Sequence, residues 1–128
     1  MNAPLVGYQY VTLRCVPRVD REEFLNVGVV LYSQAAGFLE ASFALERERL
    51  LAAWPDLDLE AVDASLGTIC RVCRGETGVG LPTLDKPGQR FGWLSAPRST
   101  VIQPGPVHGG LTRDPAAELA RLVRALVN

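Results

Sequence analysis

The chain has 128 residues and a formal net charge of −1, with 48% hydrophobic and 21% charged residues. This length fits one folded domain with one hydrophobic core, and the composition lies far from that of disordered segments. Acidic and basic residues are interspersed, which excludes an overall field that would concentrate nucleic acid or an anionic membrane. No apolar run approaches the roughly 20 residues of a membrane-spanning helix, so we expect a cytoplasmic protein that does not bind membranes.

Three segments in the first third of the chain have the pattern of strands. Residues 5–16 alternate between two faces and end before a proline. Residues 27–33 are short, β-branched and nearly continuously apolar, as in a central strand, and Gly28 within them indicates a bulge or a close backbone approach. Residues 38–44 resume strand character after a turn. The second and third segments are therefore predicted to form an antiparallel hairpin.

Helical patterns and a glycine-rich loop follow. Residues 45–54 are rich in helix formers and precede a proline. Residues 59–73 place apolar side chains on one helical face, and Asp58 before them is a candidate cap. Residues 75–89 contain four glycines and two prolines. They are predicted to form a mobile loop inside the domain.

The last third combines short strand candidates with a final helix. Residues 90–94 and 99–103 are predicted strands, and the glycines after Pro104 are predicted turns. Asp114, followed by a proline, caps a helix with an apolar stripe. The sequence therefore predicts an α+β fold over residues 1–128, a single domain in which a mainly antiparallel sheet of about 4–5 strands packs against about 2–3 helices.

No motif identifies a cofactor or a catalytic centre. The chain lacks the glycine-rich nucleotide-binding signatures, the zinc-protease motif and the serine-hydrolase motif. Cys70 and Cys73 have the spacing of zinc and redox motifs, and Cys15 and His108 could complete a zinc site. Both Cys70 and Cys73, however, lie on the apolar stripe of a predicted helix, where cysteine acts as a small hydrophobe. We therefore expect free thiols, no metal and no cofactor.

Two polar segments are the best candidates for a functional surface. In the first, Glu23 and Asn26 stand at the mouth of the central strand, where they either support acid/base chemistry or form a solvated turn. The second runs from Arg98 to His108, the only histidine. If both strands beside these segments are central in one sheet, Glu23 and Arg98 lie near each other at a sheet end. The candidate surface comprises Arg14, Glu23, Asn26, Arg98, Ser99, Thr100, Gln103 and His108.

Two of these side chains allow alternative roles. Arg14 is predicted to share a strand face with Tyr8 and Tyr10, a pattern similar to the sheet surfaces that stack single-stranded RNA. The chain lacks the glycine and aromatic signature of the RNA-recognition fold, so nucleic-acid binding is not expected. His108, in a predicted turn, either orders that turn or exchanges protons near neutral pH. Because no second histidine is present, we expect the structural role.

Two blocks, YQYVTLRCVPRVDREEFLNVGVVLYS and RFGWLSAPRSTVIQPGPVHGGLTRDPAAELARLV, resemble an uncharacterised bacterial family, the domain-of-unknown-function family thirty thirty-seven. The resemblance covers nearly the whole chain. The family has no established activity, so the resemblance implies no catalytic residue. Genes of the family lie beside genes for kinases similar to the persistence-toxin kinase, and the resemblance thereby implies a kinase-like binding partner.

The sequence and the resemblance together predict a small accessory module that acts by binding another protein, and homo-oligomers are compatible with this role. The alternative is a small enzyme that acts on a phosphate-containing or nucleic-acid substrate through the same residues. A concave pocket that joins the two polar segments would favour the enzyme, whereas a flat or convex face would favour the partner.

Overall fold

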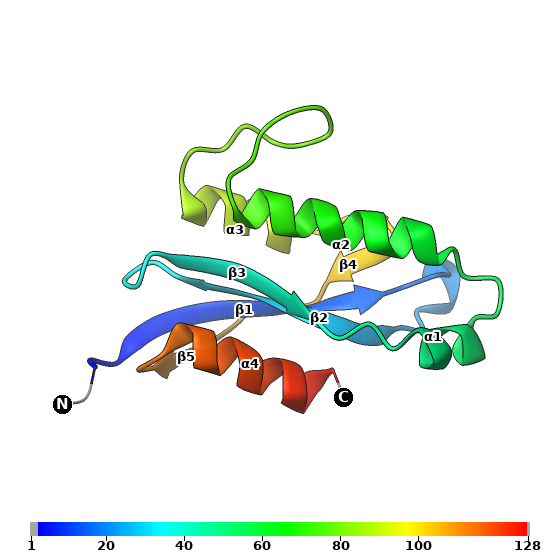
Figure 1. Ribbon diagram of the computed structural model, residues 1–128, viewed down its shortest axis with the longest axis horizontal. Coiled ribbons are helices and arrows are strands. Elements are labelled where there is room, and N and C mark those ends of the chain that lie inside the picture. The colour runs from blue at the N-terminus through cyan, green and yellow to red at the C-terminus, as the bar shows by residue number, and fades with distance from the viewer. Residues whose placement is uncertain (1–2, 128) are drawn as a thin grey trace.

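The computed structural model describes residues 3–127, in which a five-stranded antiparallel sheet lies between helices (Figure 1). The predicted α+β fold in a single domain is confirmed. The elements in chain order are β1 (Val6–Cys15), a short 3-10 helix (Val19–Arg21), β2 (Leu25–Ser33), β3 (Phe38–Phe43), α1 (Arg47–Ala53), α2 (Leu59–Cys73), α3 (Pro87–Ser95), β4 (Ile102–Pro104), β5 (His108–Thr112) and α4 (Pro115–Leu126).

The strands follow the order β3-β2-β1-β4, and β5 pairs with the same edge of β1 as β4 does. β4 pairs with residues 13–15 and β5 with residues 6–10, so the two short strands act as one edge strand that is interrupted at residues 105–107. The predicted hairpin of β2 and β3 is confirmed. Residues 99–103, expected to be a central strand, instead contribute to the short edge strand β4.

Gly28 meets both expectations drawn from the sequence. The pairing of β1 with β2 shifts there, because Leu13 pairs with Gly28 whereas the next residue, Arg14, pairs with Asn26. A Cβ atom on Gly28 would lie 2.8 Å from the backbone oxygen of Ser42 in β3. Real Cβ atoms do not approach a backbone atom so closely, so any larger residue must push β2 and β3 apart.

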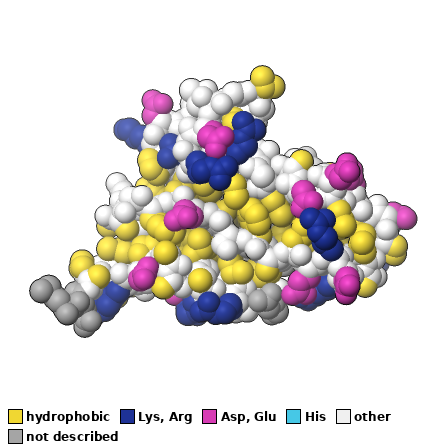
Figure 2. Space-filling model, in the orientation of Figure 1, with side chains coloured by type: hydrophobic (Ala, Val, Ile, Leu, Met, Phe, Trp, Pro, Cys, Tyr) yellow, Lys and Arg dark blue, Asp and Glu magenta, His cyan; other side chains and the backbone are white. Residues whose placement is uncertain are grey.

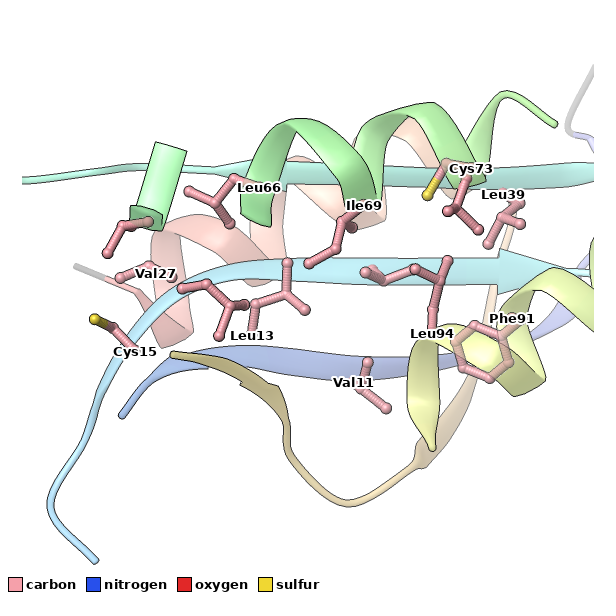
Figure 3. Packing of buried hydrophobic residues seen from close by; sticks show 14 of the residues in the cluster. Val11, Leu13, Cys15, Val27, Leu39, Leu66, Ile69, Cys73, Phe91 and Leu94 are labelled. Atoms are coloured by element: carbon pink, nitrogen blue, oxygen red, sulfur yellow. The ribbon is translucent and has the colours of Figure 1, made fainter. Parts of the chain in front are cut away.

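Each face of the sheet has its own hydrophobic core. On one face α2 and α3 pack against β1 and β2, and Figure 3 shows Leu13, Leu66 and Leu94 in this core. On the other face α4 packs over β2 and β3, with Leu31 and Leu122 between them. Side chains of β1 alternate between the two faces, as successive residues of a strand do. On this face α4 also packs on Tyr8 of β1, and the rest of the face over β1, β4 and β5 lies beside the helix.

Two segments in the last third differ from the prediction. Residues 90–94 were predicted as a strand but lie in α3. Pro87 occupies the first position of this helix, and the helix buries Phe91 and Leu94 on one face. Residues 108–112, of which the glycines were predicted as a turn, form β5. The predicted loop at residues 75–89 is shorter than expected, because its last three residues, 87–89, belong to α3.

Both predicted helix caps are present. The Asp58 carboxylate accepts a hydrogen bond from the backbone N–H of Ala61 at 3.1 Å, and the Asp114 carboxylate accepts one from Ala117 at 3.2 Å. Each cap satisfies one N–H of the first helical turn, which has no partner inside the helix. Among residues 3–127, no helix is long and apolar enough to cross a membrane.

Candidate functional site

The open part of the sheet beside α4 gathers aromatic, basic and amide side chains from four chain segments. Arg14 in β1 pairs with Gln103 in β4, and Tyr10 in β1 pairs with His108 in β5. Residues paired across antiparallel strands share a face, so all four lie on the face that carries α4. Phe24, just before β2, joins them through contact with Arg14. We call these five residues the Arg14 surface.

Arg14 is the centre of this surface and has no acidic partner among residues 3–127. The Cζ atom of its guanidinium lies 4.2 Å from the centroid of the Phe24 ring, which is a cation–π contact. On another side, a Cβ atom on Gly105 would lie 3.1 Å from Arg14 Nε, so the guanidinium packs against glycine backbone. Within the described chain, Arg14 takes part in none of the ion pairs, and its buried Nε has no hydrogen-bond partner.

His108 extends the same surface. It was predicted to lie in a turn, but it is the first residue of strand β5. Its exposed imidazole stacks on the Tyr10 ring, with ring centroids 5.3 Å apart and an angle of 29° between the ring planes. The imidazole therefore rests on an aromatic ring. Among residues 3–127, the imidazole forms no ion pair with a carboxylate.

Asn26 and Gln103 flank Arg14 and are held by hydrogen bonds to backbone. Asn26 Nδ2 donates to the carbonyl of Leu126 in the last turn of α4 at 3.1 Å, which ties β2 to that helix. Asn26 therefore lies inside β2 and not in a solvated turn. Gln103 Nε2 donates to the carbonyl of Thr100 at 3.1 Å and braces the loop before β4. Both side-chain amides therefore hold backbone segments in place beside Arg14.

Glu23 lies elsewhere, in a pocket of about 670 Å³ between the β1–β2 loop and the α1–α2 loop. Its carboxylate pairs with Arg21, and the half-buried Trp54 and Val101 also line this pocket. The neighbouring Arg18 pairs with Asp20, and this hydrogen bond lowers the pKa of the Asp20 carboxyl. The cations of the pocket are thus engaged with local carboxylates.

Arg98, Ser99 and Thr100 form a third group, in the loop between α3 and β4. The Arg98 guanidinium lies 4.3 Å from the Trp93 ring centroid and donates a hydrogen bond to the Trp93 carbonyl. Burial lowers the pKa of Arg98. Thr100 Oγ1 donates to the carbonyl of Ile102 at 2.7 Å, whereas Ser99 is exposed. Arg98 lines two pockets of about 450 and 350 Å³, and Glu23 lines neither of them.

The zinc and RNA alternatives meet structural obstacles. Cys15 in β1 and Cys73 in α2 belong to the core on the sheet face that carries α2 and α3 (Figure 3), whereas His108 lies on the opposite face of the sheet. Residues 3–127 contain no group of three or more potential metal ligands. Tyr8 is buried against α4, where its hydroxyl donates to Glu118, so it is not available to stack a base. Of the predicted aromatic row, only Tyr10 remains on the open surface.

Two members of the Arg14 surface were missed by the sequence prediction. Phe24 is an exposed aromatic residue, with 42% of its surface accessible, beside a charged stretch that reads as a solvated turn. A large apolar side chain among five charges was the available signal. Tyr10 was assigned to the right face, but its stacking on His108 depends on β5, which was not predicted.

The comparisons with known proteins identify a family and assign no activity. A family model described as a protein of unknown function (DUF3037) matches residues 10–127. No curated protein and no solved structure matches the chain. The family model spans all five members of the Arg14 surface and confirms the family predicted from the two sequence blocks. The chain belongs to the DUF3037 family of proteins of unknown function.

Proposed function

We propose that this protein is a small cytoplasmic accessory module that binds another protein through the Arg14 surface. The observation that carries the proposal is the half-buried Arg14 guanidinium, packed between Phe24 and Gly105 and without an acidic partner in the described chain. A planar guanidinium fixed in this way is suited to a carboxylate, which it binds with two parallel hydrogen bonds.

The surroundings of Arg14 favour a protein partner. Phe24 offers exposed apolar area beside the charge, and the stacked Tyr10 and His108 continue the surface along β1. Arginine and aromatic side chains are enriched at protein interfaces and contribute most of their binding energy. The expected contact on the partner is an Asp or Glu side chain next to an apolar residue.

The cellular location rests on the thiols. Cys15, Cys70 and Cys73 are all free, and Cys15 and Cys73 are buried in the core. Free thiols without a disulfide framework are usual in reducing compartments. The proposed partner therefore belongs to the cytoplasm, and a kinase-like protein, implied by the family resemblance, is the first one to test.

The enzyme alternative has weaker support. The two polar segments do not form one pocket around Glu23 and Arg98, and the arginines beside Glu23 are already paired. The same Arg14 guanidinium could also donate hydrogen bonds to a phosphate group. Phosphate binding by Arg14 is therefore one of the outcomes that the experiment distinguishes.

The experiment compares Arg14→Ala with the matched control Arg49→Ala, an exposed arginine of α1 that forms no ion pair in the described chain. Calorimetry measures the affinity of the wild type and of each variant for the partner. The partner is the purified kinase-like protein or a protein captured by the wild type. We expect Arg14→Ala to weaken binding at least about tenfold, which equals about 1.4 kcal/mol, and Arg49→Ala to change it little. Equal affinity of both variants, or binding of inorganic phosphate in place of any protein, would contradict the proposal.

A further inference from the structure

Within the described residues, the sheet has two edges, and one of them is protected against pairing with another strand. The β4 and β5 edge is interrupted at residues 105–107 and carries Pro104 and Pro106, features that prevent a continuous ladder. The opposite edge is β3, which pairs with β2 and with no other strand among residues 3–127. The β3 sequence, FLEASF, has no proline, lysine or glycine and a single charge.

The outward backbone groups of β3 follow from one hydrogen bond. The N–H of Ala44 donates to the carbonyl of Val27 in β2 at 3.0 Å. Inward and outward residues alternate along an antiparallel strand, so Glu40 and Ser42 also direct their backbone groups toward β2. The residues that direct N–H and C=O groups away from the sheet are Leu39, Ala41 and Phe43.

Apolar side chains flank this open ladder on both sides. Leu39 is buried in the core under α2 and α3, and Ala41 and Phe43 pack at the margin of that core. Phe38 and Ala44 pack at the margin of the core under α4. Figure 2 shows a band of hydrophobic side chains across the middle of this view, between α2 and α4, where β3 runs in Figure 1. Both cores therefore reach the surface along β3.

We propose that β3 pairs antiparallel with β3 of a second copy of the chain, with Ala41 at the two-fold axis. A two-fold axis perpendicular to the sheet keeps each core on its own face, so residues of equal parity must oppose one another. Centring the pair on Ala41 uses every outward backbone group and places Leu39 opposite Phe43 of the second copy.

The charge of Glu40 favours the register centred on Ala41 and favours a second copy of the chain as the partner strand. Centring the pair on Glu40 would place two carboxylates directly opposite each other, which is destabilising. Centring it on Ala41 places Glu40 opposite the hydroxyl of Ser42 in the second copy, so the single charge of the strand meets a hydrogen-bond donor. The strand is thus complementary to itself. The two sheets would join into one larger sheet, with α2 of both copies on one face and α4 of both copies on the other.

This self-pairing is independent of the proposed function. The Arg14 surface lies toward the β4 and β5 edge, whereas the proposed interface follows β3 at the opposite edge. A dimer would carry two open Arg14 surfaces. Failure of one proposal therefore leaves the other intact.

The first test is amide hydrogen exchange of the full-length protein over a concentration series, with the oligomeric state measured by sedimentation velocity. We expect a reversible dimer, and slower exchange at Leu39, Ala41 and Phe43 as concentration rises. Amides of Glu40 and Ser42 already bond to β2 and serve as the internal control, because their exchange should not change. A monomer at all concentrations would overturn the proposal, as would protection of these edge amides only when the Arg14 partner is added.

Two matched variants test the register. Ser42→Glu places like charges opposite Glu40 of the second copy, and Ser42→Lys places opposite charges there. We expect the first to weaken and the second to tighten the dimer, each by roughly two- to tenfold. Ala41→Pro removes an outward N–H while leaving the pairing with β2 intact, so it should give a folded monomer. Equal dimerisation of all three variants would show that another surface mediates association.

Discussion

The hydroxyl of Tyr8 in β1 donates a hydrogen bond to the carboxylate of Glu118 in α4, which joins the first strand to the last helix. Arg121, one turn further on, donates from Nε and Nη2 to the two oxygens of the same carboxylate, each at 2.7 Å. The Glu118 side chain is only 12% exposed. This group of three side chains holds α4 over β2 and β3, and thereby leaves the Arg14 surface beside it open.

The first prediction concerns acid stability. The hydrogen bonds from Arg121 lower the pKa of Glu118 to about 2, from an ordinary value of 4.5. A carboxyl whose folded pKa is depressed contributes stability above its unfolded pKa, and this contribution disappears as the pH falls from about 4.5 to about 2. We expect Glu118→Gln to lower the free energy of unfolding by about 1–3 kcal/mol at pH 7. Urea titrations across the pH range should show this difference vanish near pH 2.

Tyr8→Phe provides the complementary test at high pH. Burial, followed by the bond to Glu118, raises the pKa of Tyr8 from 10.0 to about 12. The wild type should therefore lose stability between these two pH values, and the phenylalanine variant should not.

A constant difference in the free energy of unfolding between wild type and Glu118→Gln at every pH would contradict the acid-stability prediction. It would show that Glu118 contributes through packing alone.

The second prediction concerns the bulge in β2. Gly28→Ala forces a Cβ atom to within 2.8 Å of the Ser42 backbone oxygen, and backbone of a paired strand moves only at a cost. We expect a loss of about 1–3 kcal/mol in the free energy of unfolding, measured by chemical denaturation. Gly92→Ala in α3 is the control, because nothing lies within 4 Å of its Cβ position, and alanine favours a helix. A stable Gly28→Ala variant would contradict the tight approach of β2 and β3.

The third prediction concerns the cysteines. Burial raises the pKa of Cys15 to about 11 and that of Cys73 to about 12, so both remain protonated at neutral pH. We expect them to resist a thiol reagent until the protein unfolds, while the half-buried Cys70 reacts slowly in the folded state. The purified protein should hold no stoichiometric zinc, and a chelator should not change its melting temperature. One zinc ion per chain would refute the core role of these thiols.

The fourth prediction concerns His108. Replacement by asparagine removes the stacking on Tyr10, a contact of about 0.5–1.5 kcal/mol, so partner affinity should fall by at most about tenfold. Neither wild type nor His108→Asn should turn over a panel of phosphodiesters and nucleotides. Loss of a general acid or base would instead reduce a rate by about 10²- to 10⁴-fold. Wild-type turnover that disappears in a folded His108→Asn variant would establish the enzyme alternative.

The sequence predicted those elements whose pattern is local. Alternation in residues 5–16, the apolar stripe of residues 59–73 and the caps at Asp58 and Asp114 each reflect contacts within one element, and each is present. Residues 90–94 were predicted wrongly, because five residues with alternating bulk fit a strand as well as a helix until the proline at the helix start is taken into account.

The errors at β5 and at the candidate surface have a common cause, which is contact over long sequence distances. Gly109 and Gly110 look like a turn, but Gly110 lies under the Tyr8 ring, where a Cβ would come within 2.7 Å of the hydroxyl. This contact joins residues more than one hundred positions apart. The Arg14 surface likewise depends on β4 and β5 returning to β1. Glu23 and Arg98 were grouped because the strands beside both were expected to be central in the sheet, but the strand that follows Arg98, β4, lies at the edge.

The location of the partner on this protein decides whether the Arg14 surface is the binding site. Amide chemical shifts of the isotope-labelled protein are followed while the unlabelled partner is added. We expect the largest changes at Tyr10, Arg14, Phe24, Gln103 and His108, which are distant in sequence and adjacent on one sheet face. Changes centred on Trp54 and Glu23, in the pocket of about 670 Å³, would contradict it.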